Sequence, residues 1–217
     1  IYREEAPERI YNLIPEVKII AILRDPSERA FSAYMHLIRD QRETTNSFSE
    51  ALELEEFRIK QGWGPIWHYK RAGLYYQQLS NYFHLFKRDQ IRVILHEDLQ
   101  HKREEVLKDI FNFLEIDTGF TPEISIKYNA SGIPKNKILQ NFYTGLFNSP
   151  NPIKRLSRII FPMPLRLKVT TYLQTRNIKK VSLPGEERQK LIGYFREDIL
   201  HLESLIMQIN TLSLPLK

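Results

Sequence analysis

The stretch of sequence that decides the fold runs from Val17 to Tyr34 and reads VKIIAILRDPSERAFSAY. Its first seven residues are almost continuously apolar and rich in β-branched side chains, which is typical of a strand buried on both faces of a parallel sheet. Asp25 can cap a helix that has Pro26 at its first position and that is expected to reach about Asp40. The stretch therefore predicts a strand, a tight turn and a helix.

Strands and helices alternate along the rest of the chain. A second strand is predicted over Ile91–Leu95, residues 128–135 are predicted as a loop, and helices are predicted over 6–14, 48–60, 69–86, 102–114, 137–147, 165–177 and 184–209. This alternation indicates an α/β domain with a mostly parallel sheet. Without a repeat or a linker, the 217 residues predict a single domain, 1–217. Two strands are too few for a stable sheet, so we expect this domain to be incomplete at its N-terminus.

Composition excludes several classes of protein. Hydrophobic residues make up 42% and charged residues 27% of the chain, as in ordinary globular proteins and unlike disordered ones. The absence of cysteine excludes disulfides, zinc–thiolate sites and cysteine nucleophiles, and it favours a cytoplasmic location. No stretch reaches the roughly 20 apolar residues of a transmembrane segment. No group of His, Asp and Glu has the spacing of a metal site, so no metal is expected.

The charge of the chain is unevenly distributed. Residues 151–217 contain 12 Lys and Arg against 5 Asp and Glu, whereas the preceding residues are nearly balanced. A basic segment of this kind favours an anionic partner, either a polyanionic acceptor or a membrane surface. The alternative is a solvated outer face.

The turn after the first strand is a candidate phosphate site. Arg24 follows that strand directly, where ligands bind in open α/β sheets. A helix N-terminus offers free backbone N–H groups to an anion, and a planar guanidinium suits phosphate. At 100° per residue, Ser32 shares a helix face with Asp25 and Arg29, opposite the apolar face of Ala30. The alternative is a solvated polar face with Arg24 in an ordinary salt bridge.

The segment from Arg24 to Tyr34 resembles the 3′-phosphate-binding segment of sulfotransferases that use 3′-phosphoadenosine-5′-phosphosulfate (PAPS). Residues 6–20, Gly73–Phe86 and Ile91–Leu99 are similar, in the same order, to the heparan-sulfate and bacterial branch of that family. The resemblance covers most of residues 6–115. It implies a three-layer α/β fold of the P-loop NTPase-like type with a parallel sheet. It also implies an enzyme that transfers a sulfuryl group from PAPS to a hydroxyl or amine of a carbohydrate or small molecule and releases the bisphosphate PAP.

The resemblance assigns Arg24 and Ser32 to the 3′-phosphate of PAPS. His96 stands where some members have a Tyr near the adenine, or it simply ends a strand. The loop with Ser131, Gly132 and Lys135 corresponds to one that closes over the 3′-phosphate. It lacks the Arg-Lys-Gly pattern of the cytosolic branch, and an ordinary Gly-Pro turn is the other interpretation.

Two parts of the family's machinery match no segment of this sequence. These are the Lys-bearing phosphate loop and the Glu or His that acts as base. We expect both to precede Ile1, and the catalytic residues stay unknown.

Aromatic and histidine side chains supply further candidates. Those between residues 63 and 76 either line an acceptor pocket or belong to the core, which is the commoner arrangement; they are Trp63, Trp67, Tyr69, Tyr75 and Tyr76. His36 and His68 would serve as base only if they reached a substrate hydroxyl, and we expect both at the surface.

Two other functions stay open. A nucleotide kinase of related fold would also need a phosphate loop. A non-catalytic basic module would bind nucleic acid or an acidic membrane surface through residues 151–217, and its binding to nucleic acid would weaken steeply with salt. A sulfotransferase, for which no nucleic-acid partner is expected, would bind PAP tightly and ATP poorly.

Overall fold

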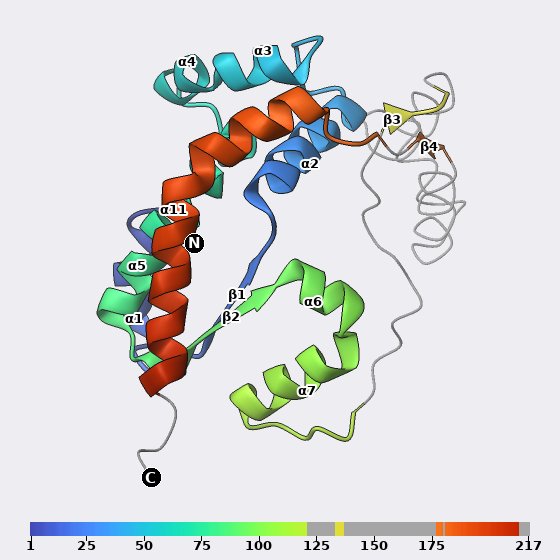
Figure 1. Cartoon of the computed structure of the whole chain (residues 1–217). Helices are drawn as coiled ribbons and strands as arrows, with labels where there is room; N and C mark the ends of the chain where they lie inside the picture. The colour runs from blue at the N-terminus through green and yellow to red at the C-terminus, as the bar shows by residue number, and fades with distance from the viewer. Residues whose placement is uncertain (121–132, 137–176, 180, 213–217) are drawn as a thin grey trace, which may run out of the picture. The chain divides into compact units, whose positions relative to one another are not determined.

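The computed structural model describes residues 1–120, 133–136, 177–179 and 181–212 (Figure 1). The chain divides into two compact units. Unit 1 consists of Ile1–Ala33, Thr45–Pro122 and Leu183–Lys217, and unit 2 of Tyr34–Thr44 and Glu123–Ser182. That both belong to a single domain stays a prediction. Arg24, Ser32 and His96 lie in unit 1, and Lys135 lies in unit 2.

Unit 1 contains two parallel strands, β1 (Ile19–Leu23) and β2 (Ile91–Leu95). They pair in register from Ile19 opposite Ile91 to Leu23 opposite Leu95. The predicted bounds of β2 are confirmed, and β1 begins two residues later than predicted. Because parallel strands end at the same edge, the segments that follow β1 and β2 are neighbours.

The two faces of β1 are packed to different degrees. Ala21 and Leu23 lie on one face and are 4% and 3% exposed, whereas Ile22 lies on the other face and is 51% exposed. That second face is still partly covered, because Ile94 of β2, opposite Ile22, is 6% exposed and α7 (Arg103–Leu114) contacts β2. The expectation of a strand buried on both faces is therefore wrong at Ile22.

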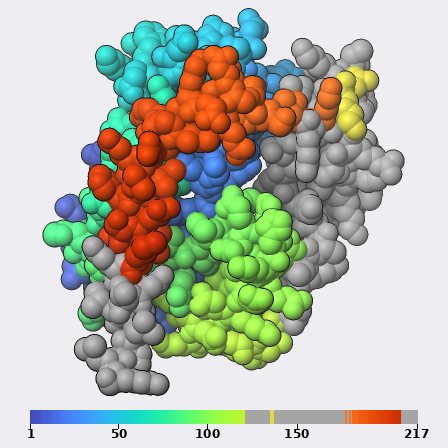
Figure 2. All heavy atoms as spheres, in the orientation of Figure 1, coloured from blue at the N-terminus to red at the C-terminus, as the bar shows by residue number. Residues whose placement is uncertain are grey.

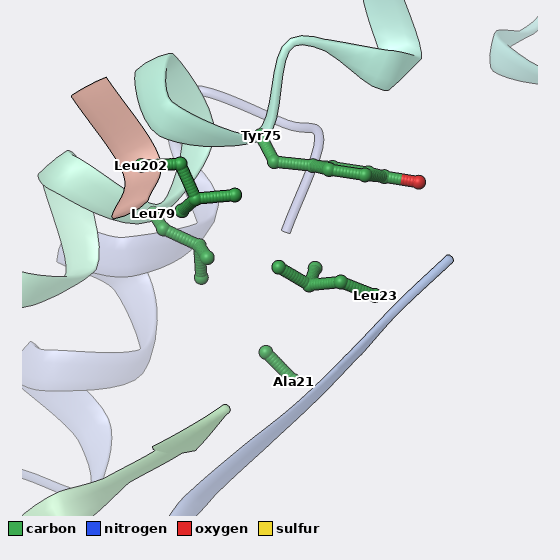
Figure 3. Packing of buried hydrophobic residues seen from close by; sticks show 5 residues of the cluster. All are labelled: Ala21, Leu23, Tyr75, Leu79 and Leu202. Atoms are coloured by element: carbon green, nitrogen blue, oxygen red, sulfur yellow. The ribbon is translucent and has the colours of Figure 1, made fainter. Parts of the chain in front are cut away.

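The main core cluster joins β1 to helices α5 (Tyr75–Leu85) and α11 (Gly185–Leu212). Its buried members, which face one another in Figure 3, are Ala21, Leu23, Tyr75, Leu79 and Leu202. Helix α11 lies alongside α5, and α1 (Ala6–Leu13) also contacts α5. This packing holds the end of β1, and so the candidate site, against two helices from distant parts of the chain.

Most of the remaining elements of unit 1 are short. The exceptions are α7 and α2, and α2 continues into unit 2. The remaining elements are α2 (Pro26–Arg39), α3 (Phe48–Glu53), α4 (Glu55–Lys60), α6 (His96–His101), α7 (Arg103–Leu114) and the 3-10 turns η1 (Pro65–Trp67), η2 (Arg71–Gly73) and η3 (Arg88–Gln90). None of the described helices is long and apolar enough to cross a membrane.

Two of the predicted helices need correction. The helix over 48–60 is two helices that meet at Leu54, and the helix over 69–86 is η2 followed by α5, because Leu74 leaves helical geometry with ψ 79°. The helix predicted over 102–114 is confirmed within one residue, and α6 precedes it. Residues 184–209 form a helix as predicted, with the bounds Gly185–Leu212.

In unit 2, Ile133–Pro134 (β3) pairs antiparallel with Ile178–Lys179 (β4). The loop predicted for 128–135 thus contains a short strand, because pairing with a distant segment supplies hydrogen bonds that local sequence does not reveal. The helices predicted over 137–147 and almost all of 165–177 lie outside the described residues.

Candidate functional site

The turn from β1 into α2 has the local structure that its sequence predicts. Asp25 Oδ1 accepts hydrogen bonds from the backbone N–H groups of Ser27 and Glu28, both at 2.9 Å. Asp25 therefore caps α2, whose first residue is Pro26. This cap leaves the beginning of α2 directly beside the end of β1.

Arg24 lies between β1 and α2 and pairs with a carboxylate one turn further on. Its Nη2 is 3.4 Å from Oε2 of Glu28, and the two side chains are 32% and 31% exposed. The salt bridge that we considered as an alternative for Arg24 is thus present. Such a partly exposed pair is worth only about 0–1 kcal/mol, so an anion that binds the guanidinium can compete with Glu28.

Ser32 lies two turns along α2 on the face that the core does not use. Ala30, on the face predicted to be apolar, is fully buried, and so is Leu37, further along the same face; Tyr34 is 6% exposed. The Ser32 hydroxyl is half-buried and makes no hydrogen bond to another described residue. Both Arg24 and Ser32 can therefore offer donors to a ligand.

Arg29 has a structural role that the sequence did not reveal. Its guanidinium donates to the backbone carbonyls of His68, at 3.4 Å, and Tyr69. Burial lowers the pKa of Arg29, because it disfavours the charged form. Arg29 therefore ties α2 to the segment that carries the aromatic cluster.

Arg188, in the first turn of α11, is a further charged residue at the β1–α2 turn that was not predicted from the sequence. Its Nη2 is 3.1 Å from Oε1 of Glu28 and 3.9 Å from Oδ2 of Asp25. Helix α11 runs over the surface shown in Figure 2, where it is coloured orange to red. No sequence signal could have found this contact, because α2 and α11 are far apart in the chain.

Comparisons with known proteins show the family of the chain. A family model described as "Sulfotransferase family" matches residues 4–122, which is more than half of the chain and includes Arg24, Ser32 and His96. The chain belongs to the sulfotransferase family. The resemblance inferred from the sequence is thereby confirmed.

Individual relatives carry the same family name. The chain is 34% identical over 89 residues to "Heparan sulfate glucosamine 3-O-sulfotransferase 6" of Mus musculus, which covers 38% of this chain and 23% of that protein. It is 30% identical over 136 residues to "Bifunctional heparan sulfate N-deacetylase/N-sulfotransferase 4" of Mus musculus, with coverages of 60% and 14%. This sulfotransferase-family chain therefore spans less than a quarter of the length of these two relatives.

A solved structure extends the likeness to the fold. The crystal structure of a sulfotransferase from Alicyclobacillus acidocaldarius superposes with a TM-score of 0.65 and 31% sequence identity, covering 93% of this chain and 59% of that chain. The P-loop-like α/β sulfotransferase fold with a parallel sheet is confirmed.

The other four predicted site residues lie outside the β1–α2 turn. His96 begins α6 directly after β2 and is half-buried, with its Nε2 3.3 Å from Nε2 of Gln100. Lys135 is exposed in unit 2, and its backbone N–H donates to the carbonyl of Asn177. Ser131 and Gly132 lie outside the described residues. The roles of these four residues in this sulfotransferase-family chain stay predictions.

His68 is buried, and the expectation of a surface histidine is wrong. It is 8% exposed, its Nε2 is 2.9 Å from the carbonyl of Trp63, and its Nδ1 is hydrogen-bonded to the Tyr2 hydroxyl. Because a carbonyl only accepts, Nε2 carries the proton and Tyr2 donates to Nδ1. Both ring nitrogens are occupied, so His68 holds Tyr2 against the loop instead of serving as a free base.

The aromatic cluster is divided between core and surface. Tyr69 and Tyr75 are 0% and 6% exposed and belong to the core, and burial raises the pKa of Tyr75. Trp63 and Trp67 are half-buried and pack edge to face with ring centroids 5.2 Å apart. Tyr76 is half-buried and packs against the main core cluster. The core interpretation therefore holds for the three tyrosines, and Trp63 and Trp67 stay candidates for an acceptor pocket.

Proposed function

We propose that this protein transfers a sulfuryl group from PAPS to a hydroxyl or amine of a carbohydrate and releases PAP. The observation that carries the proposal is the turn between β1 and α2. There the Arg24 guanidinium, the capped beginning of α2 and the Ser32 hydroxyl, which has no hydrogen bond to a described residue, come from one short segment in a chain of the sulfotransferase family.

In this proposal the described residues bind the nucleotide end of the donor. Arg24 donates charge-assisted hydrogen bonds to the 3′-phosphate, and the Ser32 hydroxyl donates a further one. The reaction breaks the bond from sulfur to the leaving phosphate oxygen, forms a bond from sulfur to the acceptor, and passes the acceptor proton to a base. As in phosphoryl transfer, the protein contributes by positioning donor and acceptor in line.

We further propose a polyanionic carbohydrate as the acceptor. Both mouse relatives are named for heparan sulfate, and residues 151–217 carry 12 basic against 5 acidic residues. A positively charged segment attracts an acidic chain over several ångströms. The absence of cysteine supports a reducing location such as the cytoplasm for this activity.

Calorimetry with PAP, ATP and adenosine 5′-phosphosulfate tests the proposal. Arg24→Ala should weaken PAP binding by about 10- to 150-fold, because hydrogen bonds to a charged group are worth about 1.5–3 kcal/mol. Ser32→Ala removes a neutral donor and should cost about two- to tenfold. Adenosine 5′-phosphosulfate lacks the 3′-phosphate, so its affinity should not respond to either change.

Arg196→Ala is the matched control, since Arg196 is exposed on α11 and makes no ion pair with another described residue. Equal losses for PAP and adenosine 5′-phosphosulfate would mean that Arg24 and Ser32 act through folding. Tight binding of ATP would favour a kinase, and salt-sensitive binding of nucleic acid without PAP binding would favour the basic module.

A further inference from the structure

Four charged side chains meet at the β1–α2 turn, and Glu28 is at their centre. Its Oε2 is 3.4 Å from Arg24 and its Oε1 is 3.1 Å from Arg188. Asp25 uses Oδ1 for the helix cap and has Oδ2 3.9 Å from Arg188. The cluster thus contains two guanidinium groups and two carboxylates.

This arrangement creates a problem for an anionic ligand at Arg24. A phosphate that binds the Arg24 guanidinium brings negative charge close to the Glu28 carboxylate, and like charges at such distances repel. The Glu28 carboxylate nevertheless reaches the same guanidinium, and so holds it at the end of β1. An orienting carboxylate is compatible with phosphate binding only if another cation balances its charge.

We propose that Arg188 is this cation, and that it is a positioning residue for the 3′-phosphate. Arg188 contacts Oε1 of Glu28, whereas Arg24 faces the other carboxylate oxygen, Oε2. When phosphate binds Arg24, the negative charge of Glu28 stays paired with Arg188, and Arg24 turns its donors to the ligand. Helix α11 would thereby contribute to nucleotide affinity without touching the nucleotide. The inference rests on the proposed function.

A double-mutant cycle tests the role of Arg188. Arg188→Gln should weaken PAP binding by about three- to tenfold, since it leaves the Glu28 charge unbalanced beside the phosphate. Arg188→Lys keeps the charge and should stay within about twofold of the wild type. Glu28→Gln removes the repelling charge, so Arg188→Gln added to Glu28→Gln should change PAP affinity by less than about twofold.

The controls separate this role from a structural one. Adenosine 5′-phosphosulfate should bind all of these variants like the wild type, and Arg196→Gln, the same charge change at an exposed position of α11, should leave PAP binding unchanged. Arg188→Gln weakening PAP equally with and without Glu28→Gln would overturn the inference, because Arg188 would then act directly or through the helix. Parallel losses for both nucleotides would overturn it as well.

The same measurements distinguish a failure of the proposed function from a failure of the role proposed for Arg188. If the wild type binds PAP no better than adenosine 5′-phosphosulfate, there is no 3′-phosphate site for Arg188 to support, and both proposals are wrong. If the wild type prefers PAP but the cycle shows no coupling between Arg188 and Glu28, the proposed function stands and the role of Arg188 is wrong.

Discussion

At the scale of single residues, Gly73 shows why the turn that carries Arg24 is held in place. A Cβ atom at Gly73 would lie 2.8 Å from Cε1 and Cζ of Phe195 and 3.1 Å from Cβ of Pro26. Phe195 is fully buried in α11, and Pro26 is the first residue of α2. Gly73 thus allows η2, α11 and the beginning of α2 to approach more closely than any other residue would.

Replacing this glycine should therefore destabilise the fold. Gly73→Ala is expected to lower the free energy of unfolding by about 1–3 kcal/mol, because a buried ring and a proline must move to accept the methyl group. Urea unfolding measures the loss. Gly193→Ala is the control: nothing would lie within 4 Å of its Cβ, and alanine favours a helix, so α11 should be stabilised by about 0.5–1 kcal/mol. A Gly73→Ala protein as stable as the wild type would contradict this close packing.

At the scale of elements, helix α5 is capped by a residue of another helix. Its N-cap residue, Leu74, has no side chain that can accept a hydrogen bond. Asp198 of α11 accepts instead from the backbone N–H groups of Tyr76, at 3.0 Å, and Gln77, at 3.4 Å. Asp198 is 7% exposed, so the N–H groups that it satisfies are shielded from water. The contact joins the two helices that cover β1.

Removal of this cap should cost stability. Asp198→Ala is expected to lower the free energy of unfolding by about 1–3 kcal/mol, since it leaves the two N–H groups without an acceptor. Chemical unfolding followed by circular dichroism measures the change. Glu197→Ala, at the exposed neighbouring position, should stay within about 0.5 kcal/mol of the wild type. If both variants lost the same stability, the loss would reflect helix α11 in general and not the cap.

In unit 2, His36 makes the end of α2 sensitive to pH. Its Nε2 is 3.1 Å from Oδ2 of Asp40, and its Nδ1 is 2.8 Å from Nη2 of Arg39. Burial lowers the pKa of His36, Arg39 and Arg42 lower it further, and Asp40 partly opposes them. The folded protein therefore binds this proton at a lower pH than the unfolded chain, in which the pKa is about 6.5.

Stability contributed by neutral His36 should be lost as pH falls. It is fully present above a pH of about 6.5 and decreases as the pH falls toward the lowered pKa of the folded state. Between about pH 7.5 and 5.5 the melting temperature should therefore decrease more in the wild type than in His36→Gln, as scanning calorimetry can measure. Equal pH slopes in the two proteins, or a wild type that gains stability in acid relative to the variant, would contradict this assignment.

At the scale of the whole molecule, the excess of basic residues in 151–217 predicts salt-sensitive binding of acidic polysaccharide. Charge reversal at Arg155 and Arg158, both outside the described residues, should weaken heparin-like chains and reduce the salt slope by about two. PAP affinity should not change. The same reversal at Arg88 and Lys108, which are exposed in unit 1, is the control. Binding that ignores both salt and the reversals at Arg155 and Arg158 would instead favour an uncharged acceptor.

Much of unit 1 could be predicted because the relevant forces are local. The apolar run before Arg24, the Asp25 cap and Pro26 at the first helical position act within a few residues, and the structure has the strand, turn and helix that they predict. The bounds of β2 were predicted for the same reason. The family could be inferred from the order of such segments, since each of them can be recognised from its own residues.

The sequence by itself therefore determined the local elements, the family and the candidate residues Arg24 and Ser32. Only the tertiary structure decided that Glu28 pairs with Arg188 as well as Arg24, that Asp198 caps α5 and that His68 is buried. It also showed Ile22 exposed, whereas its apolar neighbours predicted burial. The physical reason is the same in each case. A contact between segments far apart in the chain depends on how helices pack around β1, and the residue pattern within either segment does not predict that packing.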